Sequence, residues 1–126
     1  MTVEKSAVDL LAFWLQDLTS PMEMINGRLY IDRDRIGVSA MLSKVSEYNS
    51  EKEAQLWINT VPMIDFINDV IGYECDVSWE NRRDIISVYR SVFLWQIRDR
   101  FGDLKVSINE WFDEVDGDFG ITITQD

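Results

Sequence analysis

Apolar residues recur along most of the chain at the spacing of helices, and the widest apolar face lies in residues 78–102. At about 100° per residue, the apolar side chains there cover well over half of the helical circumference. They are Ile85, Ile86, Val88, Tyr89, Val92, Phe93, Leu94, Trp95, Ile97 and Phe101. A surface helix needs an apolar arc of only about 100°, so this helix is expected to contact neighbours on more than one side. With Ser78 as N-cap and Gly102 at the end, the segment predicts a central helix.

The preceding residues predict shorter helices packed around the central one. The first covers residues 2–18, and helical spacing returns over residues 34–48. The sequence SEKE at residues 50–53 has the form of a capping box and begins the next helix. Pro62 has no amide proton and should break or kink that helix, after which residues 63–71 predict a further one.

The residues between the first two helices are less regular. The sequence SPME at residues 20–23 has the form of a capping box with proline at the first helical position, so we expect a helical turn there. Asn26-Gly27 should end this turn. Residues 28–31 form a short extended candidate.

The C-terminal residues predict a small β element. Residues 119–124 alternate with period two and are rich in β-forming side chains, which predicts a terminal strand. Residues 105–116 leave two alternatives, a strand that turns back through Asp116-Gly117 or a short helix capped by Ser107. The Asp-Gly pair favours the hairpin.

Together these elements predict a mainly α fold in a single domain, residues 1–126. We expect a compact bundle of four to five helices around residues 78–102, with a small C-terminal β-hairpin or strand. A chain of 126 residues that is 46% hydrophobic can form its own core, since a domain of this size buries about two-thirds of its unfolded surface.

Charge is distributed unevenly. The chain has 23 acidic and 12 basic residues and no histidine, a net charge of −11. Residues 103–126 hold seven acids and one base, a net charge of −6, whereas the first 102 residues hold 16 acids and 11 bases, a net charge of −5. This balance opposes binding to nucleic acid or to an anionic membrane, and it suits a basic protein partner.

Several features predict a cytoplasmic protein. The single cysteine, Cys75, excludes an intramolecular disulfide. The N-terminal residues lack the basic start and uninterrupted apolar run of a signal peptide. No stretch approaches the roughly 20 apolar residues of a membrane span.

Residues for catalysis are missing from the sequence. Histidine, the commonest general base and metal ligand, is absent. No Gly-x-Ser-x-Gly elbow, P-loop or Gly-x-Gly-x-x-Gly sequence occurs. We therefore expect neither an enzyme nor a cofactor.

Residues 114–125 resemble a calcium-binding EF-hand loop in part. Such a loop needs glycine at its sixth position and a bidentate glutamate at its twelfth. Here those positions are Phe119 and Gln125, so we predict an acid-rich hairpin turn and no metal site.

Acidic and aromatic residues alternate near the C-terminus, and this segment is the candidate partner-binding site. Its carboxylates would steer a basic partner while its aromatic rings serve as anchors. The candidate residues are Glu110, Trp111, Asp113, Glu114, Asp116, Asp118 and Phe119. Trp79, which also lies among polar residues, is a further candidate contact. The alternative is a solvated acidic turn whose aromatic rings are buried.

In its acidity, its tryptophan content and the segment NEWFDEVDGDFGITITQD, the chain resembles immunity proteins of bacterial toxin systems, including contact-dependent growth inhibition. The resemblance implies stoichiometric binding to one cognate basic toxin domain, often a nuclease, whose active site or neighbouring surface is blocked. It implies no particular fold, and it leaves the oligomeric state open.

Two other functions remain as alternatives. One is a phage-type nucleic-acid mimic that inhibits a DNA-binding defence enzyme, and the other is a non-catalytic adaptor subunit. A mimic should spread its charge along an elongated face, whereas here the charge is concentrated at one end of the chain. That concentration favours the immunity protein.

Overall fold

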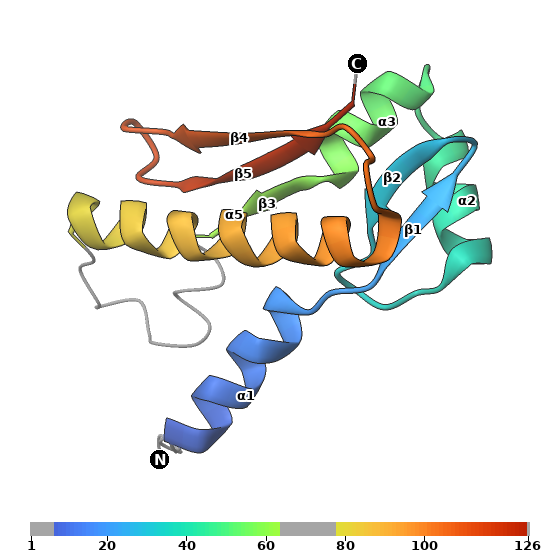
Figure 1. The fold of residues 1–126 in the computed structure, drawn as a ribbon. Helices are drawn as coiled ribbons and strands as arrows, with labels where there is room; N and C mark the ends of the chain where they lie inside the picture. Colours follow the sequence, from blue (N-terminus) through green and yellow to red (C-terminus); the bar gives the residue numbers. More distant parts are fainter. Residues whose placement is uncertain (1–6, 64–77, 126) are drawn as a thin grey trace, which may run out of the picture.

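The computed structural model describes residues 7–63 and 78–125, which form a mixed α/β fold (Figure 1). The elements are α1 (Ala7–Leu18), β1 (Met22–Ile25), β2 (Arg28–Ile31), α2 (Val38–Ser46), α3 (Glu51–Ile58), β3 (Thr60–Pro62), α5 (Trp79–Phe101), β4 (Ser107–Phe112) and β5 (Phe119–Thr124). They include a two-stranded sheet, β1-β2, and a three-stranded sheet in the order β3-β5-β4. The predicted mainly α bundle is therefore wrong.

The core lies between α5 and the three-stranded sheet. All three strands are antiparallel, with β5 in the centre, and Val61 on β3 pairs with Ile121 on β5. Alternate residues of a strand share a face, so Phe119, Ile121 and Ile123 lie on the same side of β5, and all three are buried. They belong to one apolar cluster with the buried face of α5, which is formed by Ile86, Tyr89, Phe93 and Ile97.

Helix α5 is confirmed with its two ends, but its setting differs from the prediction. The Ser78 hydroxyl accepts a hydrogen bond from the amide of Asn81 at 3.2 Å, and Gly102, at φ 60°, follows the last turn. Figure 1 shows α5 running along one side of the sheet. Only one stripe of the helix is fully buried, and Trp95 is 67% exposed. The wide apolar arc was interpreted as bundle packing because sequence spacing does not reveal that a sheet covers one face.

Residues 22–31 form a β-hairpin, so the helical turn expected at residues 20–23 is wrong. Ile25 pairs with Arg28 across the two-residue loop Asn26-Gly27. Both loop residues have positive φ, 52° and 81°, as a type I′ turn requires. This turn matches the twist of paired strands, and the pairing buries Met22 and Leu29, which outweighs a local capping signal. The extended segment expected at residues 28–31 is confirmed as β2.

Helix α3 begins where predicted but ends earlier. The Ser50 hydroxyl accepts a hydrogen bond from the Glu53 amide at 3.1 Å, as a capping residue does. The helix ends at Ile58, and residues 60–62 form the edge strand β3, in which a proline is tolerated. The start expected for the first helix at residue 2, Cys75, and the helix over residues 63–71 (apart from Met63) lie outside the described residues.

Amide side chains from α3 connect the two sheets. The fully buried Asn59 accepts a hydrogen bond from the Ile31 amide at 2.9 Å. Its side-chain nitrogen donates to the carbonyl oxygens of Leu29, at 2.8 Å, and Ile123, at 2.9 Å. Gln55 also donates to Leu29, at 3.1 Å. The outer edge of β2 is thus satisfied by side chains instead of by a further strand.

Candidate partner-binding site

The predicted site residues lie together on the C-terminal hairpin, which matches the favoured hairpin alternative. Glu110 and Trp111 are on β4, Phe119 begins β5, and the acids between them form the connecting turn. Figure 1 shows this turn at the end of the hairpin that lies nearest the first turns of α5. The side chains nevertheless face in different directions, and this determines which of them a partner can reach.

The turn is held by its own hydrogen bonds. One carboxylate oxygen of Asp113 accepts from the amides of Val115, at 3.0 Å, and Asp116, at 3.2 Å. Asp118 accepts from the amide of Phe119 at 2.7 Å. Both carboxylates are half-buried and shape the turn. The exposed carboxylates are those of Glu110, Glu114 and Asp116.

The turn is also tethered to α5. The guanidinium of Arg82 donates to the Gly117 carbonyl at 2.8 Å. The same group lies over the Trp79 ring at 4.3 Å and over the Phe119 ring at 5.6 Å. These contacts fix the hairpin against the start of the helix, so the backbone that carries the exposed carboxylates has a defined position.

Two of the predicted aromatic anchors, Trp111 and Phe119, pack largely against other parts of the fold. Phe119 is 0% exposed, so it belongs to the core and not to a binding surface. Trp111 is half-buried and lies across Gly120, where an added Cβ would come within 2.6 Å of its ring. Its indole nitrogen is buried and has no hydrogen-bond partner among the described residues. Trp111 therefore acts first as packing over the glycine.

The exposed aromatic rings at this end are Phe112 and Trp79. They meet edge to face, with ring centroids 6.1 Å apart. Val115, at the tip of the turn, is 93% exposed. Trp79 is a candidate already from the sequence, but Phe112 and Val115 were missed there. The alternation of side chains along β4 was the signal for Phe112, because it lies two residues after Glu110 and therefore on the same face of the strand. We call Trp79, Glu110, Phe112, Glu114, Val115 and Asp116 the hairpin-end surface.

Basic side chains border this surface. Arg83 lies over the Phe112 ring at 5.9 Å, and Arg82 lies beside it in the tether to the turn. The five acids of residues 110–118 and these two arginines give a net charge of −3. The hairpin end is therefore acidic but interrupted by arginine.

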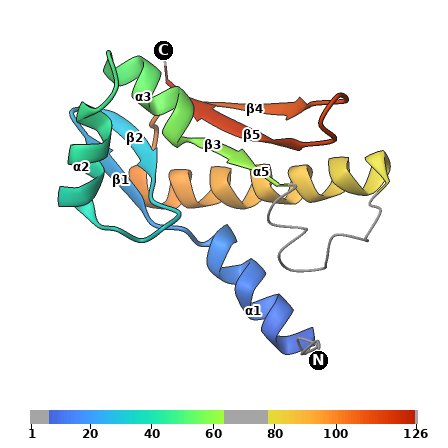
Figure 2. The same ribbon diagram turned by 180° about the vertical axis from the view of Figure 1, so that it is seen from behind.

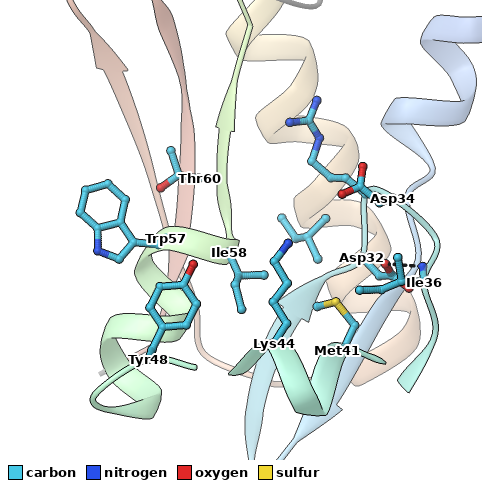
Figure 3. Close-up of a pocket in the computed structure, with 11 residues that line it drawn as sticks. Asp32, Asp34, Ile36, Met41, Lys44, Tyr48, Trp57, Ile58 and Thr60 are labelled. Carbon is cyan, nitrogen blue, oxygen red and sulfur yellow. Dashed lines mark hydrogen bonds between the residues drawn. The ribbon is translucent and has the colours of Figure 1, made fainter. Parts of the chain in front are cut away.

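A separate pocket of about 190 Å³ lies between residues 31–36, α2 and α3 (Figure 3). Lys44 points into it, and Tyr48 and Trp57 stand on one side. The Asp32 carboxylate is already occupied, because it accepts from the amides of Ile36 and Gly37, both at 2.9 Å. The volume is below the roughly 300 Å³ at which ligand pockets begin. The Thr60 hydroxyl in the lining donates to the Leu56 carbonyl at 2.6 Å and not to a base, so the pocket does not indicate a function.

Two tyrosines have raised pKa values, and both serve the fold. Burial raises the pKa of the Tyr89 phenol, and the Asp17 carboxylate, which accepts its hydrogen bond at 2.7 Å, raises this pKa further. Arg33 forms an ion pair with the same carboxylate at 3.1 Å. These contacts attach the last turn of α1 to α5, while the rest of α1 projects away (Figure 2). Burial, and then Glu51, raises the pKa of Tyr30.

Within residues 7–63 and 78–125, no three or more His, Cys, Asp or Glu side chains are grouped so that they could hold a metal ion. In the same part of the chain, no helix has both the length and the apolar character needed to cross a membrane. No protein-family model, no curated protein and no solved structure matches this chain. The functional argument therefore depends on the hairpin-end surface.

Proposed function

We propose that the chain is an immunity protein that binds and neutralises a cognate basic toxin domain, most simply a nuclease, by stoichiometric occlusion. The observation that carries the proposal is the hairpin-end surface, which combines exposed carboxylates on the C-terminal hairpin with the exposed rings of Trp79 and Phe112. In this role the chain acts in the cytoplasm, catalyses no reaction and needs no cofactor.

The mechanism follows from charge and preorganisation. A nuclease active site is basic because it must hold phosphate, so carboxylates can occupy it in place of phosphate groups. The tether from Arg82 to Gly117 and the turn bonds of Asp113 keep these carboxylates in place before binding. A preordered surface loses less conformational entropy on association.

The arginines argue against the nucleic-acid mimic. A mimic replaces a continuous line of phosphates, whereas Arg82 and Arg83 interrupt the acidic residues of this surface. Aromatic rings and arginines are enriched at protein–protein interfaces.

The test begins with the toxin domain encoded next to this gene. We expect the purified chain to form a complex of equal stoichiometry with it and to abolish its activity. Changing Glu110→Gln, Glu114→Gln and Asp116→Asn together should slow association by about tenfold or more at low salt and flatten its salt dependence. Absence of an adjacent toxin gene, or a toxin that stays fully active, would overturn the proposal.

A matched control separates local charge from overall charge. Asp34→Asn, Glu47→Gln and Asp99→Asn remove the same number of exposed carboxylates from other parts of the molecule. This variant should change association by less than about threefold, because these charges lie outside the docking surface. Equal effects of the two triple variants would mean that the hairpin end is only solvated.

A further inference from the structure

The outer edge of β4 has main-chain groups that no described residue pairs with. Antiparallel strands alternate between residues that bond to the neighbour and residues that do not. Phe119 and Ile123 use their main-chain groups toward the β3 side, bonding Met63 at 2.9 Å and Asn59 at 3.3 Å. Their partners on β4, Phe112 and Ile108, therefore direct N–H and C=O groups outward.

The same alternation applies to Glu110, midway between these two residues. Among the described residues, none donates to or accepts from the outward groups of Ile108, Glu110 and Phe112 outside the strand ladder. Figures 1 and 2 show β4 at the upper margin of the sheet, with no described helix or strand beyond it. A bare edge of this kind is a template for another strand.

The outer edges of β2 and β3 are treated differently. On β2, the Leu29 amide donates to the Gln125 side chain at 2.6 Å, and Asn59 and Gln55 bond to the Ile31 amide and the Leu29 carbonyl. The edge strand β3 has only three residues and ends in Pro62, which has no amide proton. By contrast β4 has six residues, and its outward groups have none of these protections.

We infer that the edge of β4 is where the partner docks, by adding an extended basic segment as a fourth strand of the sheet. This inference rests on the proposed function and specifies how the toxin domain is held. Main-chain bonds to Ile108, Glu110 and Phe112 would supply affinity, and the side chains opposite them would supply specificity.

Charge selects a basic partner over a second copy of the chain. If two β4 strands paired antiparallel with Ile108 of each opposite Phe112 of the other, Glu110 of each chain would lie opposite the other, and like charges in that position are destabilising. A lysine or arginine of the partner opposite Glu110 makes this charge interaction attractive. Arg83 covers the Phe112 end, so the basic residue belongs at the centre, with apolar residues opposite Ile108 and Phe112.

The test uses a synthetic peptide, so it does not require the toxin. The peptide Thr-Ile-Thr-Lys-Thr-Ile-Thr, with blocked ends, has its lysine opposite Glu110 in either strand direction. We expect it to bind at least tenfold more tightly than the same peptide with glutamate in place of lysine. In antiparallel addition, N-methylation of its lysine and both isoleucines should abolish binding, whereas N-methylation of the alternate threonines should not; parallel addition reverses these two results.

Amide hydrogen exchange of the unaltered chain gives a second readout. Peptide binding should slow exchange at Ile108, Glu110 and Phe112 by at least tenfold and leave Asn109 and Trp111 nearly unchanged. Glu110→Pro should lose this binding by tenfold or more, and Glu110→Gln by a smaller factor, with both variants checked for folding.

Three results would overturn the inference. The first is that both N-methylated peptides bind equally well. The second is that the glutamate peptide binds as tightly as the lysine peptide, and the third is that the chain forms dimers through β4 at the assay concentration. Each would leave the proposed function standing if the toxin domain is still neutralised. Conversely, failure to neutralise the toxin together with alternating amide protection by the peptide would overturn only the proposed function.

Discussion

Replacing Asn59 by alanine tests whether amide side chains hold the two sheets together. The substitution removes three hydrogen bonds of 2.8–2.9 Å in a fully buried position. The Leu29 carbonyl keeps its bond from Gln55, but the Ile31 amide and the Ile123 carbonyl lose their side-chain partner. Leaving a buried polar group unsatisfied costs about 1–3 kcal/mol, so two such groups should cost about 2–6 kcal/mol.

The assay is urea unfolding followed by tryptophan fluorescence and circular dichroism. The midpoint should fall without a change in slope, because the surface exposed on unfolding stays the same. Gln55→Ala is the matched control. Asn59 still donates to Leu29 in that variant, and the other partners of Gln55, Arg28 and Gln125, are half-buried and can bond to water instead. We expect it to cost less than Asn59→Ala. A loss below about 1 kcal/mol for Asn59→Ala would refute the reasoning, because it would mean that water replaces the amide without penalty.

Three further outcomes are expected. Gly120→Ala should lower the free energy of unfolding by about 1–3 kcal/mol in thermal melts, since its Cβ would lie 2.2 Å from the Val61 carbonyl oxygen. An unchanged melting temperature would mean that β3 and β5 can move apart to accommodate the added methyl group. Ile97→Ala should cost about 2–5 kcal/mol in urea, whereas Trp95→Ala, at an exposed position of the same helix, should cost less than about 1 kcal/mol. Because the folded pKa of Tyr89 is raised, the contribution of this tyrosine to the free energy of unfolding is fully present below the unfolded pKa of about 10. This contribution is lost as the pH rises above that value. Unfolding measured at about pH 8 and pH 11 should show less pH dependence in Tyr89→Phe, and an identical dependence would contradict this.

The elements that were predictable are those defined by their own sequence. Helix α5 has a serine cap, a glycine end and apolar spacing throughout, and all three signals are local. Helix α3 likewise begins at a serine cap. The strand over residues 119–124 was readable because alternation and β-forming residues coincide.

The elements that were missed are decided by distant partners or by competing local signals. Strand β3 has three residues and exists because it pairs with β5, about 60 residues later in the chain. Residues 20–23 carry a capping-box sequence, yet Asn26-Gly27 is the stronger signal because its positive φ values favour a hairpin. The mainly α prediction failed at these two places, since each converts a helical segment into an edge of a sheet.

In the candidate site too, the grouping of residues was predictable from the sequence, whereas the contacts of their side chains were not. The sequence placed the acids together, but it could not reveal that Asp113 and Asp118 use their carboxylates on backbone amides or that Phe119 lies in the core. Those assignments depend on the turn between β4 and β5. The same pairing turns the main chain at Glu110 outward, so the exposed carboxylate and the bare edge share a residue. A basic strand would meet both at once, which is why the hairpin, and not the acidic composition alone, carries the argument for a protein partner.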